Sequence, residues 1–181
     1  MPIAGHDVRP GFALWLTGLP ASGKSAIARE LVKRLHERGV NPAVLESDVL
    51  RAQLTPFPRY DEAEREIFYG ALTELGVFLC GKGVPVIFDA TGNRRAYRDG
   101  ARARIGRFAE IFVDTPLELC AARDPKGLYR AAREGKSSSL PGAQAAYEPP
   151  QAPEFVVHAG VVAPAAAAQD IIAFLERRAW L

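Results

Sequence analysis

A glycine-rich octapeptide is the first stretch of this sequence that could do chemistry. "GLPASGKS", residues 18–25, fits the pattern G-x-x-x-x-G-K-[ST], in which backbone N–H groups converge on phosphate oxygens at the start of a helix. Lys24 is expected to span the β- and γ-phosphates, and the Ser25 hydroxyl to bind Mg²⁺. The stretch therefore predicts a triphosphate site, with ATP as the favoured nucleotide. The predicted nucleotide-binding residues are Gly18, Ala21, Ser22, Gly23, Lys24 and Ser25.

Acidic residues follow two further apolar runs of the chain. Asp48 comes shortly after "AVL", and Asp89 comes directly after "VIF". In open α/β sheets, chemistry collects beyond the carboxyl ends of the strands. Asp48 is a candidate for accepting the proton of an attacking hydroxyl, and Asp89 stands where a Walker-B acid is expected. We expect Ser25, Asp48 and Asp89 to bind the metal, although either acid could simply cap a helix.

Alternating strands and helices position these residues. The predicted strands cover residues 12–18, 42–47, 84–90, 109–115 and 154–159. The predicted helices cover residues 24–38, 61–83, 94–105, 116–123 and 164–180. This order predicts an α/β fold, with a five-stranded parallel sheet covered by helices on both faces. We expect residues 1–181 to form a single domain.

A proline-rich segment interrupts this alternation between the fourth and fifth predicted strands. Residues 123–153 contain several glycines and basic residues and read as irregular. A long irregular stretch inside a compact domain is usually a functional lid or is disordered. We predict a lid.

Bulk composition excludes several classes of protein. With 48% apolar and 24% charged residues among 181, the chain is an ordinary globular one. A net charge of +2 gives no argument for a nucleic-acid or membrane partner. Because no 18-residue apolar run or signal-peptide pattern occurs, we expect a soluble cytoplasmic protein. Cys80 and Cys120 are expected to be buried small apolar residues rather than a disulfide or metal ligands.

The second half of the chain resembles a known family. "FVDTPLELCAARDPKGLYRAAREG", residues 112–135, followed by "YEPPQAPE", residues 147–154, resembles the adenylylsulfate (APS) kinases. That family carries VDTPLE-x-C-x-x-RDPKGLY-x-x-AR-x-G and then YE-x-P-x-x-PE, and the resemblance extends over roughly residues 12–156. It implies a P-loop kinase fold that transfers the γ-phosphate of ATP to the 3′-hydroxyl of APS, giving PAPS in sulfate assimilation. It also implies a homodimer.

The resemblance further implies roles for individual residues. Asp48 and Arg51 match the second acid and the arginine of the family's D-G-D-N-x-R, and Arg51 would bind the anionic acceptor. Phe57 matches an aromatic residue that stacks on the APS adenine. The lid residues are Arg123, Lys126 and Gly127, with Lys126 contacting phosphate and substrate. The expected catalytic residues are Lys24, Asp48, Arg123 and Lys126. The expected substrate-binding residues are Arg51, Phe57, Arg65, Thr91, Asn93, Lys126 and Gly127.

The departures from the family pattern lie on the acceptor side. D-G-D-N reads "ESDV", I-S-P-Y-R is replaced by "ATGNRR", and F-T-G-x-D reads "LPGAQ". D-R-x-E-N reads "DEAER", so Glu62 replaces a substrate-binding arginine, and only an inward turn of Arg65 could compensate. Leu140 replaces the second stacking aromatic residue, and such stacking contributes about 1–3 kcal/mol per base. The donor half of the site is thus kept while the acceptor half is rewritten.

These departures keep several functions open. APS is the leading acceptor, and another small anionic or nucleotide acceptor, such as a cytidine diphosphate derivative, is the alternative. "DATGN" is also typical of kinases acting on polynucleotide ends or sugars, for which Arg94 and Arg95 would clamp a phosphate. A non-catalytic nucleotide sensor is disfavoured, because a binding module has no need for both Asp48 and Asp89.

Overall fold

The computed structural model describes residues 9–55, 57–136 and 139–181. Its strands form one sheet in the order β2-β3-β1-β4-β5, and each neighbouring pair is parallel. The strands are β1 (Ala13–Thr17), β2 (Ala43–Glu46), β3 (Val86–Asp89), β4 (Phe108–Asp114) and β5 (Phe155–His158). The predicted five-stranded parallel sheet is confirmed, with strand ends shifted by one or two residues.

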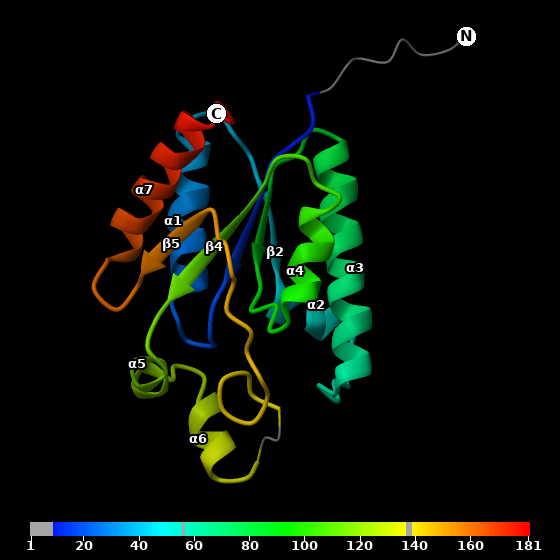
Figure 1. The fold of residues 1–181 in the computed structure, drawn as a ribbon, viewed down its shortest axis with the longest axis vertical. Coiled ribbons are helices and arrows are strands. Elements are labelled where there is room, and N and C mark those ends of the chain that lie inside the picture. The colour runs from blue at the N-terminus through cyan, green and yellow to red at the C-terminus, as the bar shows by residue number, and fades with distance from the viewer. Residues whose placement is uncertain (1–8, 56, 137–138) are drawn as a thin grey trace.

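Helices cover both faces of this sheet (Figure 1), as predicted. They are α1 (Lys24–His36), α2 (Ser47–Leu54), α3 (Glu62–Gly81), α4 (Arg95–Arg102), α5 (Leu117–Arg123), α6 (Leu128–Arg133) and α7 (Pro164–Arg177). Successive side chains of β1 point to opposite faces. Leu14 and Leu16 pack with α1 and α7, while Ala13 and Trp15 pack with α3 and α4. Since both faces are buried, β1 can be apolar throughout.

The strand register brings the predicted acids to one edge of the sheet. Asp89 at the end of β3 lies between Leu16 of β1 and Glu46 of β2. The phosphate loop leaves β1 one residue after Leu16, and α2 with Asp48 follows β2 directly. Residues from three separate segments therefore meet beyond the carboxyl ends of the strands.

The predicted lid segment also lies beyond these strand ends (Figure 1), but it is more ordered than the sequence indicated. It contains the short helix α6, which was not predicted, just as α2 was not. The Asp124 carboxylate accepts hydrogen bonds from the backbone N–H groups of Tyr129 and Arg130, and these bonds stabilise the first turn of α6. Cys120, Tyr129 and Leu140 form a small core of their own. Residues 137 and 138 of the predicted lid lie outside the described ranges.

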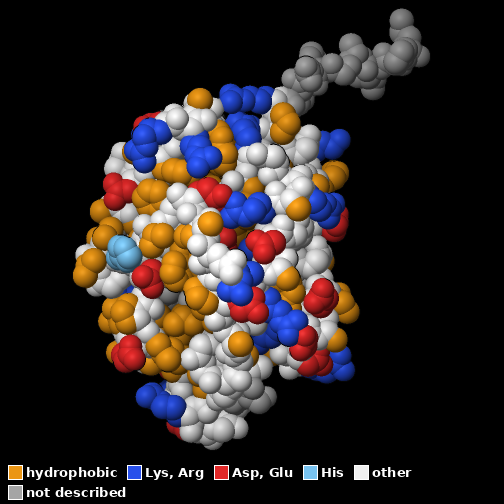
Figure 2. Space-filling view, viewed as in Figure 1, with side chains coloured by type: hydrophobic (Ala, Val, Ile, Leu, Met, Phe, Trp, Pro, Cys, Tyr) orange, Lys and Arg blue, Asp and Glu red, His pale blue; other side chains and the backbone are white. Residues whose placement is uncertain are grey.

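On the face shown in Figure 2, basic and acidic side chains are interspersed. Among the described residues, no helix combines the length and apolar character that crossing a bilayer requires. Cys80 and Cys120 are buried, as expected, and both are free. The assignment of residues 1–181 to one domain stays a prediction, because it includes residues 1–8.

Candidate active site

The phosphate loop has the backbone geometry that its glycines predict. The φ angles of Gly18, Ala21 and Gly23 are 152°, 61° and 110°, all positive. A side chain at position 18 would place its Cβ 2.5 Å from the carbonyl oxygen of Val113, so only glycine fits there. The loop leads straight into α1, whose free N–H groups face it. This is the arrangement that receives phosphate oxygens.

Lys24 lies buried at the head of α1. Its Nζ donates to the carbonyl oxygens of Gly18 at 3.0 Å and Leu19 at 2.8 Å. Burial lowers the pKa of Lys24 to about 8, and the nearby carboxylate of Asp89 opposes this shift. A phosphate group brought against the ammonium would favour its charged form and raise the pKa again.

Lid residues contact the phosphate loop directly. Arg123 donates from Nη1 to the carbonyl oxygen of Ser22 at 3.4 Å and from Nη2 to that of Ala159 at 2.9 Å. The Tyr129 hydroxyl donates to the carbonyl oxygen of Pro20 at 3.0 Å. The base of the lid is therefore hydrogen-bonded to the loop that would hold the nucleotide. These bonds place Arg123 close to the predicted nucleotide site.

Two predicted catalytic residues, Asp48 and Lys126, meet across 78 residues of sequence. The Lys126 Nζ donates to the Asp48 carboxylate, and this hydrogen bond raises the pKa of Lys126. Both side chains are largely exposed, so the pair adds little stability. The pair matters because it places Lys126 of the lid in contact with Asp48, the proposed proton acceptor.

The predicted metal residues suit Mg²⁺ in their chemistry. Ser25 exposes its hydroxyl in the first turn of α1, Asp89 is buried at the end of β3, and Asp48 lies in the first turn of α2. Within the described ranges, no group of three His, Cys, Asp or Glu residues is arranged to hold a metal. Mg²⁺ at kinase sites needs only one or two carboxylates together with phosphate oxygens and water. An all-oxygen set of this kind fits, and the metal assignment stays a prediction.

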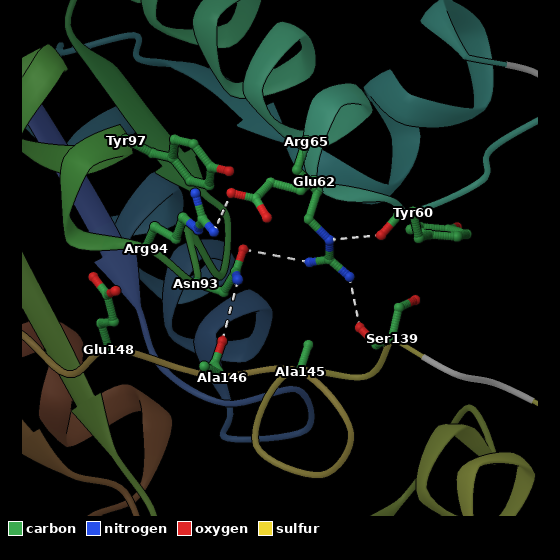
Figure 3. A pocket seen from close by; sticks show the side chains of 10 residues that line it. All are labelled: Tyr60, Glu62, Arg65, Asn93, Arg94, Tyr97, Ser139, Ala145, Ala146 and Glu148. Atoms are coloured by element: carbon green, nitrogen blue, oxygen red, sulfur yellow. Dashed lines mark hydrogen bonds and ion pairs between the residues drawn. The ribbon is translucent and has the colours of Figure 1, made fainter.

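A cavity of about 270 Å³ lies between α3, α4 and the end of the lid segment (Figure 3). It is lined by Tyr60, Glu62, Arg65, Asn93, Arg94, Tyr97, Ser139, Ala145, Ala146 and Glu148. Figure 3 shows Arg65 reaching from α3 into the middle of this group. The cavity wall is therefore formed in part by the loop after β3 and in part by the lid segment.

Arg65 makes hydrogen bonds only to neutral acceptors among the described residues. It donates to the carbonyl oxygen of Tyr60 at 2.9 Å, to Asn93 Oδ1 at 3.3 Å and to the carbonyl oxygen of Ser139 at 2.6 Å. The side chain is buried, yet no carboxylate in the described ranges pairs with it. A buried cation that borders a cavity without a counter-charge suits an anionic ligand. Arg65 thus points into the cavity, which is the orientation it needs to replace the arginine lost at position 62.

Glu62, where the family has arginine, forms an ion pair with Arg94 (Figure 3). The hydrogen bond from Arg94 accompanies an increase in the pKa of its guanidinium. The pair offsets the negative charge of Glu62 at the cavity wall, and the other lining carboxylate, Glu148, lies 3.9 Å from Arg95 Nε.

The other predicted acceptor residues are placed unevenly. Arg51 is buried, with Nη1 2.5 Å from Glu64 Oε1 and its guanidinium 3.9 Å from the centre of the Phe68 ring. Phe57 is 92% exposed and does not line the cavity. Asn93 is buried and lines it.

Thr91 and Gly127 contribute backbone rather than side chain to this region. The carbonyl oxygen of Thr91 accepts from Thr17 Oγ1 at 2.6 Å, and Gly127 precedes α6 in a left-handed conformation. Leu140 packs into the lid core, so it takes a structural position in place of an aromatic face.

Sequence reasoning missed several residues of this region. Arg98 and Glu110 form a buried ion pair, and Tyr147 and Glu148 pack beside them. "YEPP" marks Tyr147 and Glu148, although the motif does not reveal their contacts. In the sequence, Arg98 is one of several basic residues on a predicted helix, and no motif marks it as different from the others.

Comparisons with known proteins agree with this geometry. The family model described as "Adenylylsulphate kinase" matches residues 10–158. An adenylyl-sulfate kinase of Klebsiella pneumoniae is 39% identical over 151 residues, covering 82% of this chain and 75% of the relative. An Escherichia coli K12 adenylyl-sulfate kinase is 38% identical over 151 residues, with the same coverage.

Solved structures are similar as well. The Mycobacterium tuberculosis APS kinase in complex with AMPPNP and APS superposes with a TM-score of 0.87 at 33% identity, covering 92% of this chain and 98% of that one. A hexameric APS kinase from Thiobacillus denitrificans has a TM-score of 0.70 at 24% identity, covering 96% of this chain and 30% of that one. At that identity the second likeness concerns the fold alone.

Proposed function

Because this chain belongs to the adenylylsulfate kinase family, we infer that it transfers the γ-phosphate of ATP to the 3′-hydroxyl of adenylyl sulfate, giving PAPS and ADP. The family match over residues 10–158 carries this conclusion, since it spans both the phosphate loop and the lid. The chain is a phosphotransferase with an alcohol group as acceptor, it uses ATP with Mg²⁺, and it serves sulfate assimilation.

The donor half of the reaction belongs to the phosphate loop. Its backbone N–H groups and Lys24 bind the β- and γ-phosphates, and Arg123 adds a cation from the lid side. Ser25, Asp48 and Asp89 would hold Mg²⁺, which when bound neutralises charge on the phosphates. The buried position of Lys24 limits access of water to its ammonium group.

The acceptor half requires a proton acceptor and a cation. The 3′-oxygen forms a bond to the γ-phosphorus as the bond from that phosphorus to the β–γ bridging oxygen breaks, and the hydroxyl proton passes to Asp48. Lys126, already hydrogen-bonded to Asp48, keeps the carboxylate oriented. Arg65 binds an anionic group of the acceptor inside the cavity.

Release of ADP from Mg·ATP, measured in a coupled assay with and without adenylyl sulfate at low micromolar concentration, tests this function. Strong dependence on adenylyl sulfate is expected. ATP binding without such turnover would contradict the acceptor and direct attention to nucleoside diphosphate derivatives. The placement of Leu140 inside the lid core is the observation that favours this second candidate, because it removes a stacking surface.

We also propose that the protein is a homodimer. Ile67, Leu75 and Phe78 lie along α3 at a helical spacing and are 72%, 38% and 61% exposed. An exposed apolar row of this kind suits association with a second copy. The cytoplasmic location stays a prediction from the sequence, which cell fractionation would check.

A further inference from the structure

Arg98 is among the most deeply buried charged side chains in the described ranges, and no function has yet been given to it. We propose that Arg98 is a positioning residue for the acceptor site: it holds two backbone segments that form one wall of the cavity. This inference rests on the proposed function in one respect, namely that the cavity receives the acceptor.

Arg98 uses its guanidinium to join three elements. From α4, Nε donates to Glu110 Oε1 of β4 at 2.5 Å, Nη1 donates to the carbonyl oxygen of Gly92, and Nη2 donates to the carbonyl oxygen of Glu148 at 2.7 Å. The side chains of Arg98 and Glu110 are 1% and 6% exposed. A planar fork can serve three acceptors in fixed directions, which a lysine ammonium on a flexible stem cannot do.

The two carbonyl groups belong to segments that also bind each other. The Glu148 N–H donates to the carbonyl oxygen of Asn93 at 2.8 Å, and Asn93 Nδ2 donates to the carbonyl oxygen of Ala146 at 3.1 Å. The Arg95 N–H donates to Glu148 Oε2 at 2.8 Å. Arg98 therefore lies behind a small hydrogen-bonded wall made of the loop after β3 and the end of the lid segment.

This wall reaches the cavity through Asn93. Asn93, Ala146 and Glu148 line the cavity directly, and Asn93 Oδ1 accepts a hydrogen bond from Arg65. A loosened wall would release one of the three acceptors that fix the Arg65 guanidinium. Contacts of Arg98 do not include the phosphate loop, so the effect should fall on the acceptor and spare ATP.

Arg102 provides a matched control from the same helix. It also binds Glu110, with Nη2 3.1 Å from Oε2, and it binds Glu154, but it contacts neither Gly92 nor Glu148. R102Q thus weakens the same ion-pair network without touching the wall. Because R98M alone would leave Glu110 with one donor fewer, the test variant is the double substitution R98M/E110Q, in which Arg102 keeps Glu154. R98K is a second variant that keeps the charge.

The experiment compares these purified variants with the parent protein in two measurements. The first is steady-state kinetics with separately varied ATP and adenylyl sulfate. R98M/E110Q and R98K are expected to raise the KM for adenylyl sulfate by about tenfold or more, with the KM for ATP unchanged, while R102Q changes neither. A rise in both KM values, or an equal rise in R102Q, would overturn the proposal.

The second measurement is hydrogen–deuterium exchange of the nucleotide-free protein. R98M/E110Q should exchange faster in peptides covering residues 91–95 and 146–149, and R102Q should not. Unchanged exchange there would overturn the positioning role. If the parent protein fails to use adenylyl sulfate, the proposed function fails by itself, and the exchange data still decide whether Arg98 holds the wall.

Discussion

At the scale of single residues, the site depends on cations placed for phosphate and on one carboxylate placed for a proton. Lys24, Arg65 and Arg98 are all buried, but they differ in their partners. Lys24 has carbonyl groups of the phosphate loop, Arg65 has neutral acceptors around a cavity, and Arg98 has Glu110. The first two can therefore bind an anionic substrate, whereas Arg98 is engaged in structure.

The lowered pKa of Lys24 predicts how nucleotide binding depends on pH. With a pKa of about 8, the ammonium is charged below pH 8 and loses its proton above it, whereas an unfolded lysine stays charged to higher pH. ATP affinity should therefore fall as the pH rises through 8, and binding at pH 8.5 should take up protons. Calorimetry in buffers of different ionisation enthalpy measures this uptake.

The variant K24M should lose both turnover and proton uptake. The exposed Lys33 gives the control K33M, which should keep both. An active K24M enzyme would refute the assignment of Lys24.

Asp48 should affect the chemical step more than nucleotide binding. D48N removes the proton acceptor but keeps the shape, and Ser25 and Asp89 remain for the metal, so kcat should fall by about 10²–10⁴-fold while the Kd for ATP changes little. Asp99, exposed on α4, supplies the control D99N. Rapid-quench measurement of the transfer step checks the prediction, and unchanged turnover in D48N would remove Asp48 from the mechanism.

Arg65 should set affinity for the anionic acceptor. Loss of a hydrogen bond to a charged group costs about 1.5–3 kcal/mol, which corresponds to a 10- to 100-fold higher KM for adenylyl sulfate in R65M. The exposed Arg59 gives the control R59M. Equal KM values in the two variants would show that the cavity does not bind the acceptor through Arg65.

At the scale of elements, the lid is a short helical unit with its own core. α5 and α6 pack through Cys120, Tyr129 and Leu140, and Arg123 and Tyr129 bind the phosphate loop. Lys126 on Asp48 and Ser139 on Arg65 are further contacts between the lid segment and the rest of the chain. The lid therefore touches both halves of the site.

Gly127 offers a test of this element. It precedes α6 with a φ of 67°, and Gly39 after α1 has a φ of 73°, so an alanine at either position should cost about 1–2 kcal/mol in the free energy of unfolding. Both G127A and G39A should lose similar stability in denaturant titrations. Only G127A should lower kcat/KM, because only Gly127 adjoins Lys126; equal activity of the two variants would argue against a functional lid.

At the scale of the whole molecule, the proposed dimer makes a prediction of its own. Light scattering coupled to gel filtration should give twice the 19.6 kDa chain mass. F78D places a charge in the exposed row of α3 and should shift the protein towards monomer, whereas E74Q, at a polar position nearby, should not. A monomeric parent protein, or a dimer that is indifferent to F78D, would contradict this use of α3.

The sequence by itself determined the features that depend on local backbone and on alternation. The glycine spacing of residues 18–25 predicted the phosphate loop. The positive φ angles of Gly18 and Gly23, and the close approach of Gly18 to Val113, explain why the loop needs glycine at these positions. Short apolar runs separated by helices predicted the parallel sheet, and the motif of residues 112–135 predicted the family. Asp48 and Asp89 could be placed at one edge because parallel strands end together.

Only the tertiary structure decided which side chains face each other. The inward turn of Arg65, the pairing of Lys126 with Asp48, the burial of Leu140 in the lid and the Arg98–Glu110 pair each join different elements of the structure. A helical period tells which face of α3 or α4 carries an arginine, but the partner depends on what packs against that face. These contacts arise from burial and hydrogen-bond satisfaction among several segments at once, so no local pattern of residues encodes them.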